Sequence, residues 1–171
     1  MGQLKPAVSA ADHHQGALTA RIVLVEYGDF ECPYCGAAYP ELKAVQRALG
    51  DDLCFVFRNF PLANAHPHAL RAAQFAEAAA RIDRFWQMHD TLFEHQDALD
   101  DEDLIGYARE LGFDRALIEA TLRGDFEAKV RADFSGGVRS GVNGTPCLFI
   151  DGRRYEGPAS AEALVQILRG G

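Results

Sequence analysis

The sequence predicts an α/β protein in which a β-α-β unit, a helical insertion and a β-β-α unit follow one another along the chain. Short β-branched runs bounded by turn residues predict the strands, and a long central stretch with helical periodicity predicts the insertion. We expect residues 1–19 to form a leader and loop. Residues 20–62 and 140–171 should form one domain around a central sheet, and residues 63–139 should form an all-helical subdomain inserted into it.

The first unit contains two strands and one helix. Ile22–Tyr27 and Leu53–Arg58 are apolar runs with too few polar alternations for a half-exposed strand, so we expect both strands to be buried. Pro33–Leu49 has a helical pattern, because proline suits a first helical turn and Gly50 can end the helix. A strand, a helix and a strand in this order predict a right-handed parallel crossover.

The helical insertion extends from Pro67 to about Ala132. The pattern breaks near Asp97–Asp101, Gly112–Asp114 and Arg123–Asp125, where aspartates can cap the helices that follow. We therefore expect several short helices rather than one long one.

The last unit begins with an apolar run at Cys147–Ile150. Asp151-Gly152 predicts a hairpin turn to a short strand at Arg153–Tyr155. A helix from Ser160 to Arg169 should complete the domain.

Length and charge exclude several classes of function. With 171 residues, the chain can bury a core without disulfide bonds, and its four cysteines are too few for a disulfide-stabilised scaffold. The net charge of −8 disfavours nucleic acid and anionic membranes as partners. The longest apolar run, Leu53–Phe57, is far too short to span a membrane. We expect a soluble monomer.

The N-terminal residues Met1–Ala10 contain no apolar run behind a basic start, so they do not predict a secretory signal peptide. This favours a cytoplasmic location for the chain as written. A processed periplasmic or extracytoplasmic protein would have a similar start.

The strongest chemical signal is Cys32-Pro33-Tyr34-Cys35, which follows a buried strand and opens a helix. The helix N-terminus favours a thiolate at Cys32, whereas Cys35, one turn further on, should keep its proton. We therefore expect Cys32 to be the nucleophile and Cys35 to resolve the mixed disulfide. A structural disulfide and half of a zinc site are the alternatives for this spacing, although the sequence has no second CxxC and no HxxxH.

Three segments carry a resemblance to a known family. Glu26–Cys35 resembles the active-site segment of the DsbA-like branch of the thioredoxin superfamily, and Gly141–Pro146 resembles its second active-site loop. The insertion, including Phe85–Asp90, is also similar, so the resemblance covers about residues 12–170. It implies a thioredoxin-like fold and thiol–disulfide exchange with unfolded or thiol-containing protein substrates. The family needs no small-molecule cofactor, and glutathione or a redox partner would regenerate the pair.

The same resemblance assigns substrate binding to the loops around the cysteines. In the family, the proline that matches Pro146 is cis and faces the CxxC pair, so we expect a cis bond between Thr145 and Pro146. The main chain of Thr145, together with the Pro33-Tyr34 turn, would then contact an extended substrate peptide.

Glu26 is a carboxylate in an otherwise apolar strand, and Arg58 ends the next strand. Because an unpaired buried charge is costly, we expect these two side chains to form an ion pair. The family has an acid and a base at the matching positions, so the pair should tune the cysteine pKa.

Tyr34 carries no positive charge, unlike the histidine of strongly oxidising family members, and Asp29 and Glu31 lie close by in sequence. We therefore expect the pKa of Cys32 to be nearer ~7 than the extreme of ~3.5 found for DsbA.

Two other functions fit the same residues. Cys147 directly follows Pro146, so Cys32, Cys35 and Cys147 could bind zinc or an iron–sulfur cluster, although a core position is the expected role of Cys147. A chaperone that binds polypeptides independently of redox chemistry is the second alternative.

The histidines do not predict a metal site by their spacing. His66 and His68 flank a proline at the start of a helix, where we expect only capping or solvent contact.

Overall fold

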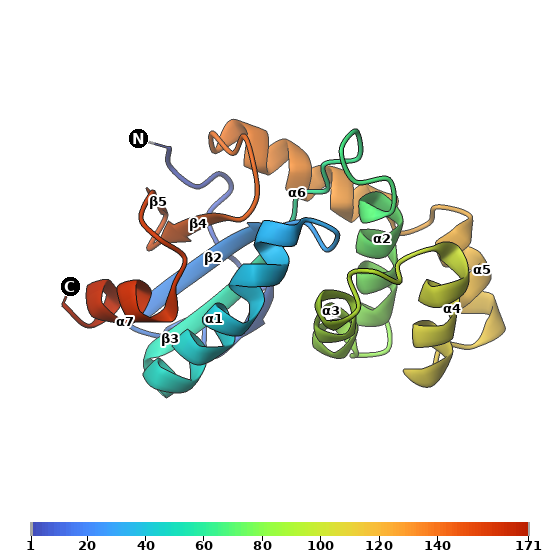
Figure 1. The fold of residues 1–171 in the computed structure, drawn as a ribbon, viewed down its shortest axis with the longest axis horizontal. Coiled ribbons are helices and arrows are strands. Elements are labelled where there is room, and N and C mark those ends of the chain that lie inside the picture. The colour runs from blue at the N-terminus through green and yellow to red at the C-terminus, as the bar shows by residue number, and fades with distance from the viewer. Residues whose placement is uncertain (1, 171) are drawn as a thin grey trace.

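The computed structural model describes residues 2–170, which form a five-stranded sheet with helices on both faces and a helical part at one end (Figure 1). The elements in chain order are β1 His13–Gln15, β2 Ile22–Gly28, α1 Pro33–Leu49, the short 3-10 helix η1 Gly50–Asp52, β3 Leu53–Asn59, α2 Ala69–Ala80, α3 Phe85–Glu94, α4 Asp101–Glu110, α5 Arg115–Leu122, α6 Glu127–Arg139, β4 Cys147–Ile150, β5 Arg153–Tyr155 and α7 Ala161–Arg169.

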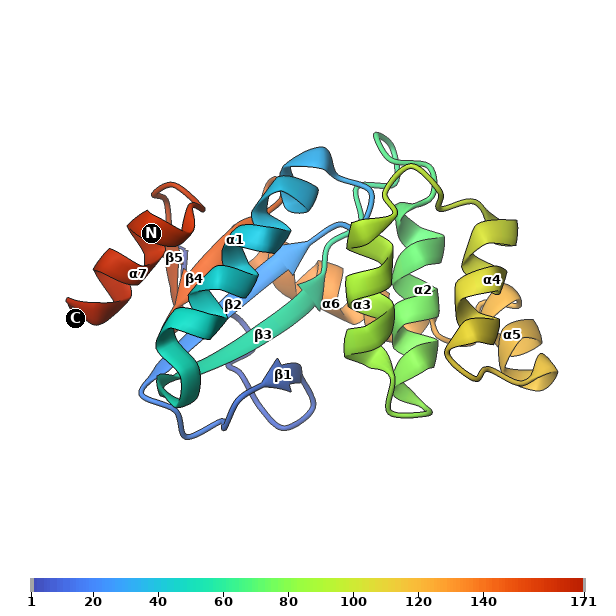
Figure 2. The same ribbon diagram turned by 60° about the horizontal axis from the view of Figure 1, so that its bottom comes forward.

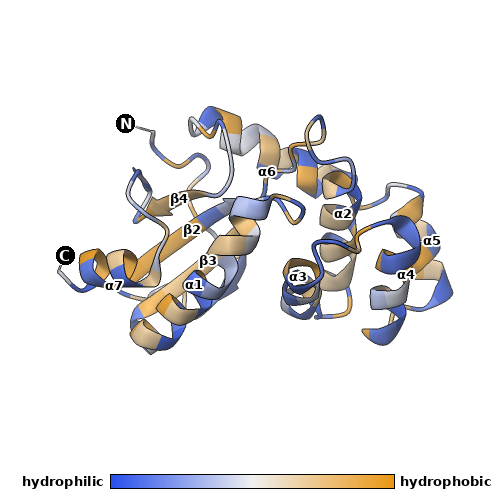
Figure 3. Ribbon diagram, in the orientation of Figure 1, coloured by the Kyte–Doolittle hydropathy of each residue, from blue (hydrophilic) through white to orange (hydrophobic). Residues whose placement is uncertain are grey.

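The sheet has the strand order β1-β3-β2-β4-β5. β2 and β3 are parallel, as predicted, and the other three pairings are antiparallel. β2 lies at the centre, and both β2 and β4 are hydrophobic over most of their length (Figure 3). The mixed α/β class with a helical insertion is therefore confirmed.

Each face of the sheet has its own hydrophobic core. Leu24 and Phe55 pack with Leu42 of α1 and Leu164 of α7 on one face. On the other face, Tyr27 packs with the N-terminal segment and α6. Gly137 of α6 allows this close approach, because a Cβ atom there would come within 2.7 Å of the Phe60 ring.

The helical part packs against the end of the sheet that carries the cysteines. Its core, built from α2 to α6, continues into Phe30 and Phe57 of the sheet domain, and Cys32 and Cys35 belong to the same cluster. Figure 2 shows α2 and α3 side by side next to the sheet, with α4 and α5 beyond them. No helix within residues 2–170 is long and apolar enough to span a membrane.

The leader differs from the prediction, because His13–Gln15 forms β1, an edge strand antiparallel to β3. The polar sequence His-His-Gln has no apolar alternation, so only its pairing with β3 reveals it as a strand. The helical insertion also has a break near Asp83 that the periodicity did not show; Asp83 has a positive φ of 57°.

The predicted ion pair between Glu26 and Arg58 is wrong. In the parallel register of β2 and β3, Glu26 lies opposite Phe57, whereas Arg58 lies opposite Tyr27. Because neighbouring residues of a strand point to opposite faces, Glu26 and Arg58 lie on different sides of the sheet.

Arg58 instead holds the N-terminal segment in place. Its Nε and Nη2 donate to the two carboxylate oxygens of Asp12 at 2.8 and 3.0 Å, and Nη1 donates to the Pro6 carbonyl and the Tyr27 hydroxyl at 2.9 and 3.1 Å. Burial opposes ionisation of Asp12, but the hydrogen bonds from Arg58 lower its pKa below the usual value. Arg58 is therefore a structural residue.

This pair makes a stability prediction. The Arg58 and Asp12 side chains are 3% and 8% exposed, so Asp12→Ala leaves a buried guanidinium without its carboxylate. We expect it to lower the free energy of unfolding by about 3 kcal/mol in urea denaturation. Arg115→Ala is the matched control, because it removes an exposed pair with Glu119 and should cost no more than about 1 kcal/mol. Equal losses in the two variants would contradict this role for Arg58.

Candidate active site

The CxxC motif lies where the central strand ends and the first long helix begins. Cys32 is the residue before the first helical turn, has an extended backbone with φ −68° and ψ 123°, and is followed by Pro33 as the first helical residue. The carbonyl of Cys32 accepts the first helical bond, from the Gly36 N–H at 3.0 Å. The sulfur of Cys32 thus faces the unpaired N–H groups of the helix.

The surroundings of Cys32 favour its thiolate. A hydrogen bond from the Cys35 thiol lowers the pKa of Cys32 to about 5, and it does so against the effect of burial. Thr145 and the backbone N–H groups of Cys35 and Tyr34 lower the pKa further. The value lies below the expectation of about 7, because these groups come from the folded turn and the second loop and compensate for the missing charge at Tyr34.

The surroundings of Cys35, in contrast, favour its protonated thiol. Its side chain is fully buried, and burial raises the pKa of its thiol strongly. The hydrogen bond that it gives to Cys32 and the charge of Glu26 raise the pKa further. The Asp29 N–H donates to its sulfur at 3.5 Å. Cys32 therefore carries the negative charge of the pair and Cys35 keeps its proton.

Glu26 lies on the face of the sheet that α1 covers and is 2% exposed. Burial raises its pKa to about 8, and the charge of Cys32 contributes to this rise. Its Oε1 atom is buried and has no hydrogen-bond partner. Glu26 is therefore a neutral carboxylic acid near pH 7, without the basic partner predicted for it.

Asp29 is a second buried carboxylate in the turn, and its role there is more than that of a nearby charge. Its Oδ1 accepts the backbone N–H groups of Glu31 and Cys32 at 2.8 and 3.2 Å. Its Oδ2 accepts the Leu62 N–H at 2.9 Å and bonds to the His66 ring at 2.8 Å. Asp29 therefore fixes the turn before Cys32 and joins it to the segment after β3.

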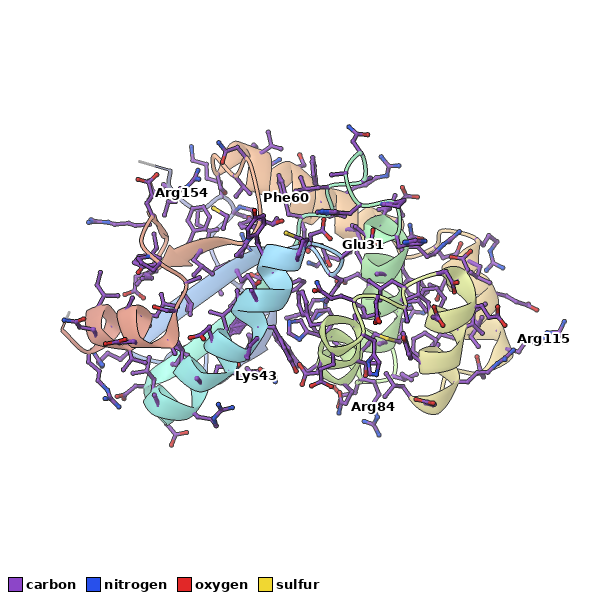
Figure 4. All side chains as sticks on the ribbon, in the orientation of Figure 1. Glu31, Lys43, Phe60, Arg84, Arg115 and Arg154 are labelled. Carbon is purple, nitrogen blue, oxygen red and sulfur yellow. The ribbon has the colours of Figure 1, made fainter. Side chains whose placement is uncertain are left out.

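Two histidines of that segment lie against the active-site turn rather than serving only as caps. His66 Nδ1 lies 2.8 Å from Asp29, and His68 Nδ1 lies 2.6 Å from Glu31. Figure 4 places Glu31 near the N-terminal end of α1, between the sheet and the helical part. The two pairs join residues more than thirty positions apart, and no local pattern marks them.

The helical part also contacts the turn directly. Gln96, between α3 and α4, donates from Nε2 to the carbonyl oxygens of Phe30 and Cys32 at 2.9 and 2.8 Å. Gly36 makes room for this contact, because a Cβ atom there would overlap the Gln96 amide. No local sequence pattern marks Gln96 as part of the site.

The second loop reaches the reactive cysteine. The Cys32 thiol donates to the Thr145 carbonyl at 3.6 Å, so residues 113 positions apart meet here. The bond between Thr145 and Pro146 is cis. Tyr34 is 75% exposed and so lies open at the surface beside Cys32.

Cys147 does not join the other two cysteines. It lies opposite Tyr27 in the sheet register and packs in the core on the α6 face, where burial raises the pKa of its thiol. Within residues 2–170, no group of three or more His, Cys, Asp or Glu side chains is placed to bind a metal ion. The geometry therefore does not provide the three-thiol site considered from the sequence.

Comparison with known proteins decides the family, because the family model described as thioredoxin matches residues 9–169. The chain belongs to the thioredoxin family. Among curated proteins, the chain is 40% identical over 171 residues to the Na(+)/H(+) antiporter NhaA 1 of Mycolicibacterium vanbaalenii, covering 98% of this chain and 28% of that protein. The chain thus spans about a quarter of the length of the curated relatives that it matches.

Solved structures confirm the DsbA-like form of the thioredoxin fold. Oxidised BdbD from Bacillus subtilis is similar with a TM-score of 0.85 and 21% identity, covering 99% of this chain and 95% of that one. The thiol-disulfide exchange protein alpha-DsbA2 from Wolbachia pipientis is similar with a TM-score of 0.80 and 20% identity, covering 94% and 87%.

The difference between the two thiols of this thioredoxin-family site predicts selective alkylation. In the reduced protein, iodoacetamide should label Cys32 with a rate that rises through a midpoint near pH 5, because only the thiolate reacts. Cys35 should stay unlabelled from pH 4 to 9, as judged by peptide mass. Labelling of both cysteines with one midpoint near the ordinary cysteine pKa would contradict the geometry.

Glu26 predicts a pH dependence of stability. A carboxyl group whose pKa rises on folding from 4.5 to about 8 stabilises the fold below pH 4.5 and loses this contribution as pH rises toward 8. Relative to Glu26→Gln, the reduced wild type should therefore lose up to about 1.4 kcal/mol of unfolding free energy per pH unit in this window.

Urea denaturation of both proteins in reductant at several pH values measures this difference. Parallel stability curves for the wild type and Glu26→Gln between pH 5 and 8 would show that Glu26 is ionised in the fold.

Proposed function

We propose that this protein exchanges disulfides with thiol-containing protein substrates through a Cys32–Cys35 redox pair. The observation that carries the proposal is the placement of the two cysteines, with Cys32 at the start of α1 beside the Thr145 carbonyl and Cys35 fully buried one turn further on. This placement lowers the pKa of Cys32 to about 5 and raises the pKa of Cys35. Exchange needs one sulfur that leaves readily as a thiolate and a second that is held back until it resolves the mixed disulfide. The thioredoxin fold around the pair supports the same chemistry.

In the oxidising direction, a substrate thiolate attacks Cys32 Sγ of the Cys32–Cys35 disulfide. The S–S bond breaks, its electron pair goes to Cys35 Sγ, and that sulfur takes up a proton. A second substrate thiolate then attacks the substrate sulfur of the mixed disulfide and displaces the Cys32 thiolate. The substrate loses two electrons and forms its disulfide, and the protein gains two electrons and one proton.

Glu26 is suited to carry the proton of Cys35. A Cys35 thiolate is a poor leaving group because its pKa is raised, so its release needs a nearby acid. Glu26 holds a proton near pH 7, since burial raises its pKa to about 8. Once ionised, its negative charge favours the protonated thiol of Cys35. In the reducing direction, the ionised carboxylate would take the proton back.

The substrate would be an extended or unfolded segment that pairs with the main chain of Thr145. Support comes from the Thr145 carbonyl, which lies 3.6 Å from Cys32 Sγ beside the cis bond to Pro146. Recognition through backbone groups tolerates many side chains. The exposed Tyr34 ring would contact the same segment.

Regeneration would use glutathione or a redox partner, and the proposal includes no resident metal or small-molecule cofactor. A stabilised Cys32 thiolate favours the reduced form, so we place the reduction potential between about −120 and −230 mV. The direction of net exchange then follows the surrounding glutathione potential.

The proposal is tested with a reduced, unfolded protein substrate in glutathione buffer. The wild type should accelerate disulfide formation, and Cys32→Ser should retain only the glutathione background. Cys35→Ser should lose the acceleration too, because it cannot form the Cys32–Cys35 disulfide, and any substrate that it captures should be held as a mixed disulfide at Cys32 that Cys35 can no longer release. Cys54→Ser is the control, because Cys54 lies in the core on the α6 face of the sheet and should not affect turnover. A Cys32→Ser variant as active as the wild type would refute the proposal.

A further inference from the structure

The Asp29 carboxylate presents an electrostatic problem for the thiolate at Cys32. Asp29 is 1% exposed, and its Oδ1 atom accepts the Cys32 N–H at 3.2 Å. A buried negative charge so close to Cys32 opposes the thiolate unless a positive charge offsets it. The CxxC motif provides none, because neither Pro33 nor Tyr34 has a basic side chain.

The offsetting group lies outside the motif. Segment 60–68 runs from β3 to α2 and is bound to the active-site turn by four contacts with carboxylates. Asp29 Oδ2 bonds to the Leu62 N–H and to the His66 ring, and Glu31 bonds to the N–H and the ring of His68. Of the two histidines, His66 reaches the fully buried carboxylate, so its charge is screened less.

Building on the redox pair proposed above, we propose that His66 is a positioning residue for the Cys32 thiolate. Its imidazolium, 2.8 Å from Asp29 Oδ2, offsets the charge of Asp29 and favours the negative form of Cys32. The segment after β3 thereby supplies the cation that the Pro33-Tyr34 dipeptide lacks.

The same contacts favour the protonated form of His66. The hydrogen bond with Asp29 raises the pKa of His66, against the effect of burial, and the charges of Asp29 and Cys32 raise it further. By linkage, if the Cys32 thiolate favours the imidazolium, the imidazolium favours the thiolate equally. The His66 charge is present below its raised pKa and is lost above it, so it is present where Cys32 titrates.

The other charged groups around the segment are accounted for. Glu31 and His68 form the second pair on the turn, and their side chains are 17% and 45% exposed. Glu26 and Cys35 act on Cys32 from beneath the turn. Beside the segment lie three further ion pairs, which are Glu127 with Arg131 in α6, Arg71 of α2 with Asp101 of α4, and Arg123 with Asp125 between α5 and α6.

The test is the pKa of Cys32 in His66→Gln, followed by the ultraviolet absorbance of the thiolate. The amide of Gln can keep a donor toward Asp29 but carries no charge. We expect the pKa of Cys32 to rise by about 0.5 to 1 unit, less than the shift by a cation in direct contact. His68→Gln is the matched control, and its more exposed pair should give less than half of that rise.

A reciprocal measurement uses the wild type alone. His66 should titrate at a higher pH in the dithiol protein than in the disulfide protein, as followed by NMR, because oxidation removes the negative charge of Cys32. The imidazole of His95, which bonds to the Thr91 carbonyl, is the internal reference.

The outcomes separate the two proposals. An unchanged Cys32 pKa in His66→Gln, or identical His66 titrations in the two redox forms, would overturn the role of His66 while the redox pair stands. Failure of Cys32 and Cys35 to form a redox couple in glutathione would instead overturn the proposed function.

Discussion

Three acidic side chains gather in a small buried region at the carboxyl end of β2, and the site depends on which of them carries negative charge. Burial disfavours charge on all three. The Cys32 sulfur ionises because the Cys35 thiol and the start of α1 donate hydrogen bonds to it. Glu26 has a buried oxygen without a partner and keeps its proton. Asp29 is held by three backbone N–H groups and the His66 ring. The positions of the hydrogen-bond donors therefore favour one charge state of the site, in which Cys32 is a thiolate and Glu26 keeps its proton.

Those donors come from distant parts of the chain, which explains why the site needs the whole fold. Gln96 of the helical part holds the carbonyls of the turn, segment 60–68 holds its carboxylates, and Thr145 approaches the sulfur from the second loop. The helical part and the sheet also share one hydrophobic cluster that contains both cysteines. The helical insertion thus contributes directly to the geometry of the CxxC turn.

The parts that sequence could predict are those with a local signal. The apolar runs of β2 and β3 and the proline-led helix after Cys32 are local patterns, and so were predicted. The predicted partner of Glu26 was wrong because it depends on the exact register of β2 and β3. A shift of one residue moves a side chain to the other face of the sheet. β1 was missed because its residues are polar and only pairing with β3 makes them a strand. His66 and Gln96 were missed because their roles arise from contacts across more than thirty residues.

The central claim is that Cys32 and Cys35 act as one two-electron pair whose reduced form is stabilised by the Cys32 thiolate. The most direct measurement equilibrates the protein in glutathione buffers of graded potential, traps free thiols by alkylation and locates the labels by peptide mass. The account predicts that both cysteines change together in a single transition between about −120 and −230 mV, while Cys54 and Cys147 do not change. Separate transitions for Cys32 and Cys35, or no transition in this range, would contradict it.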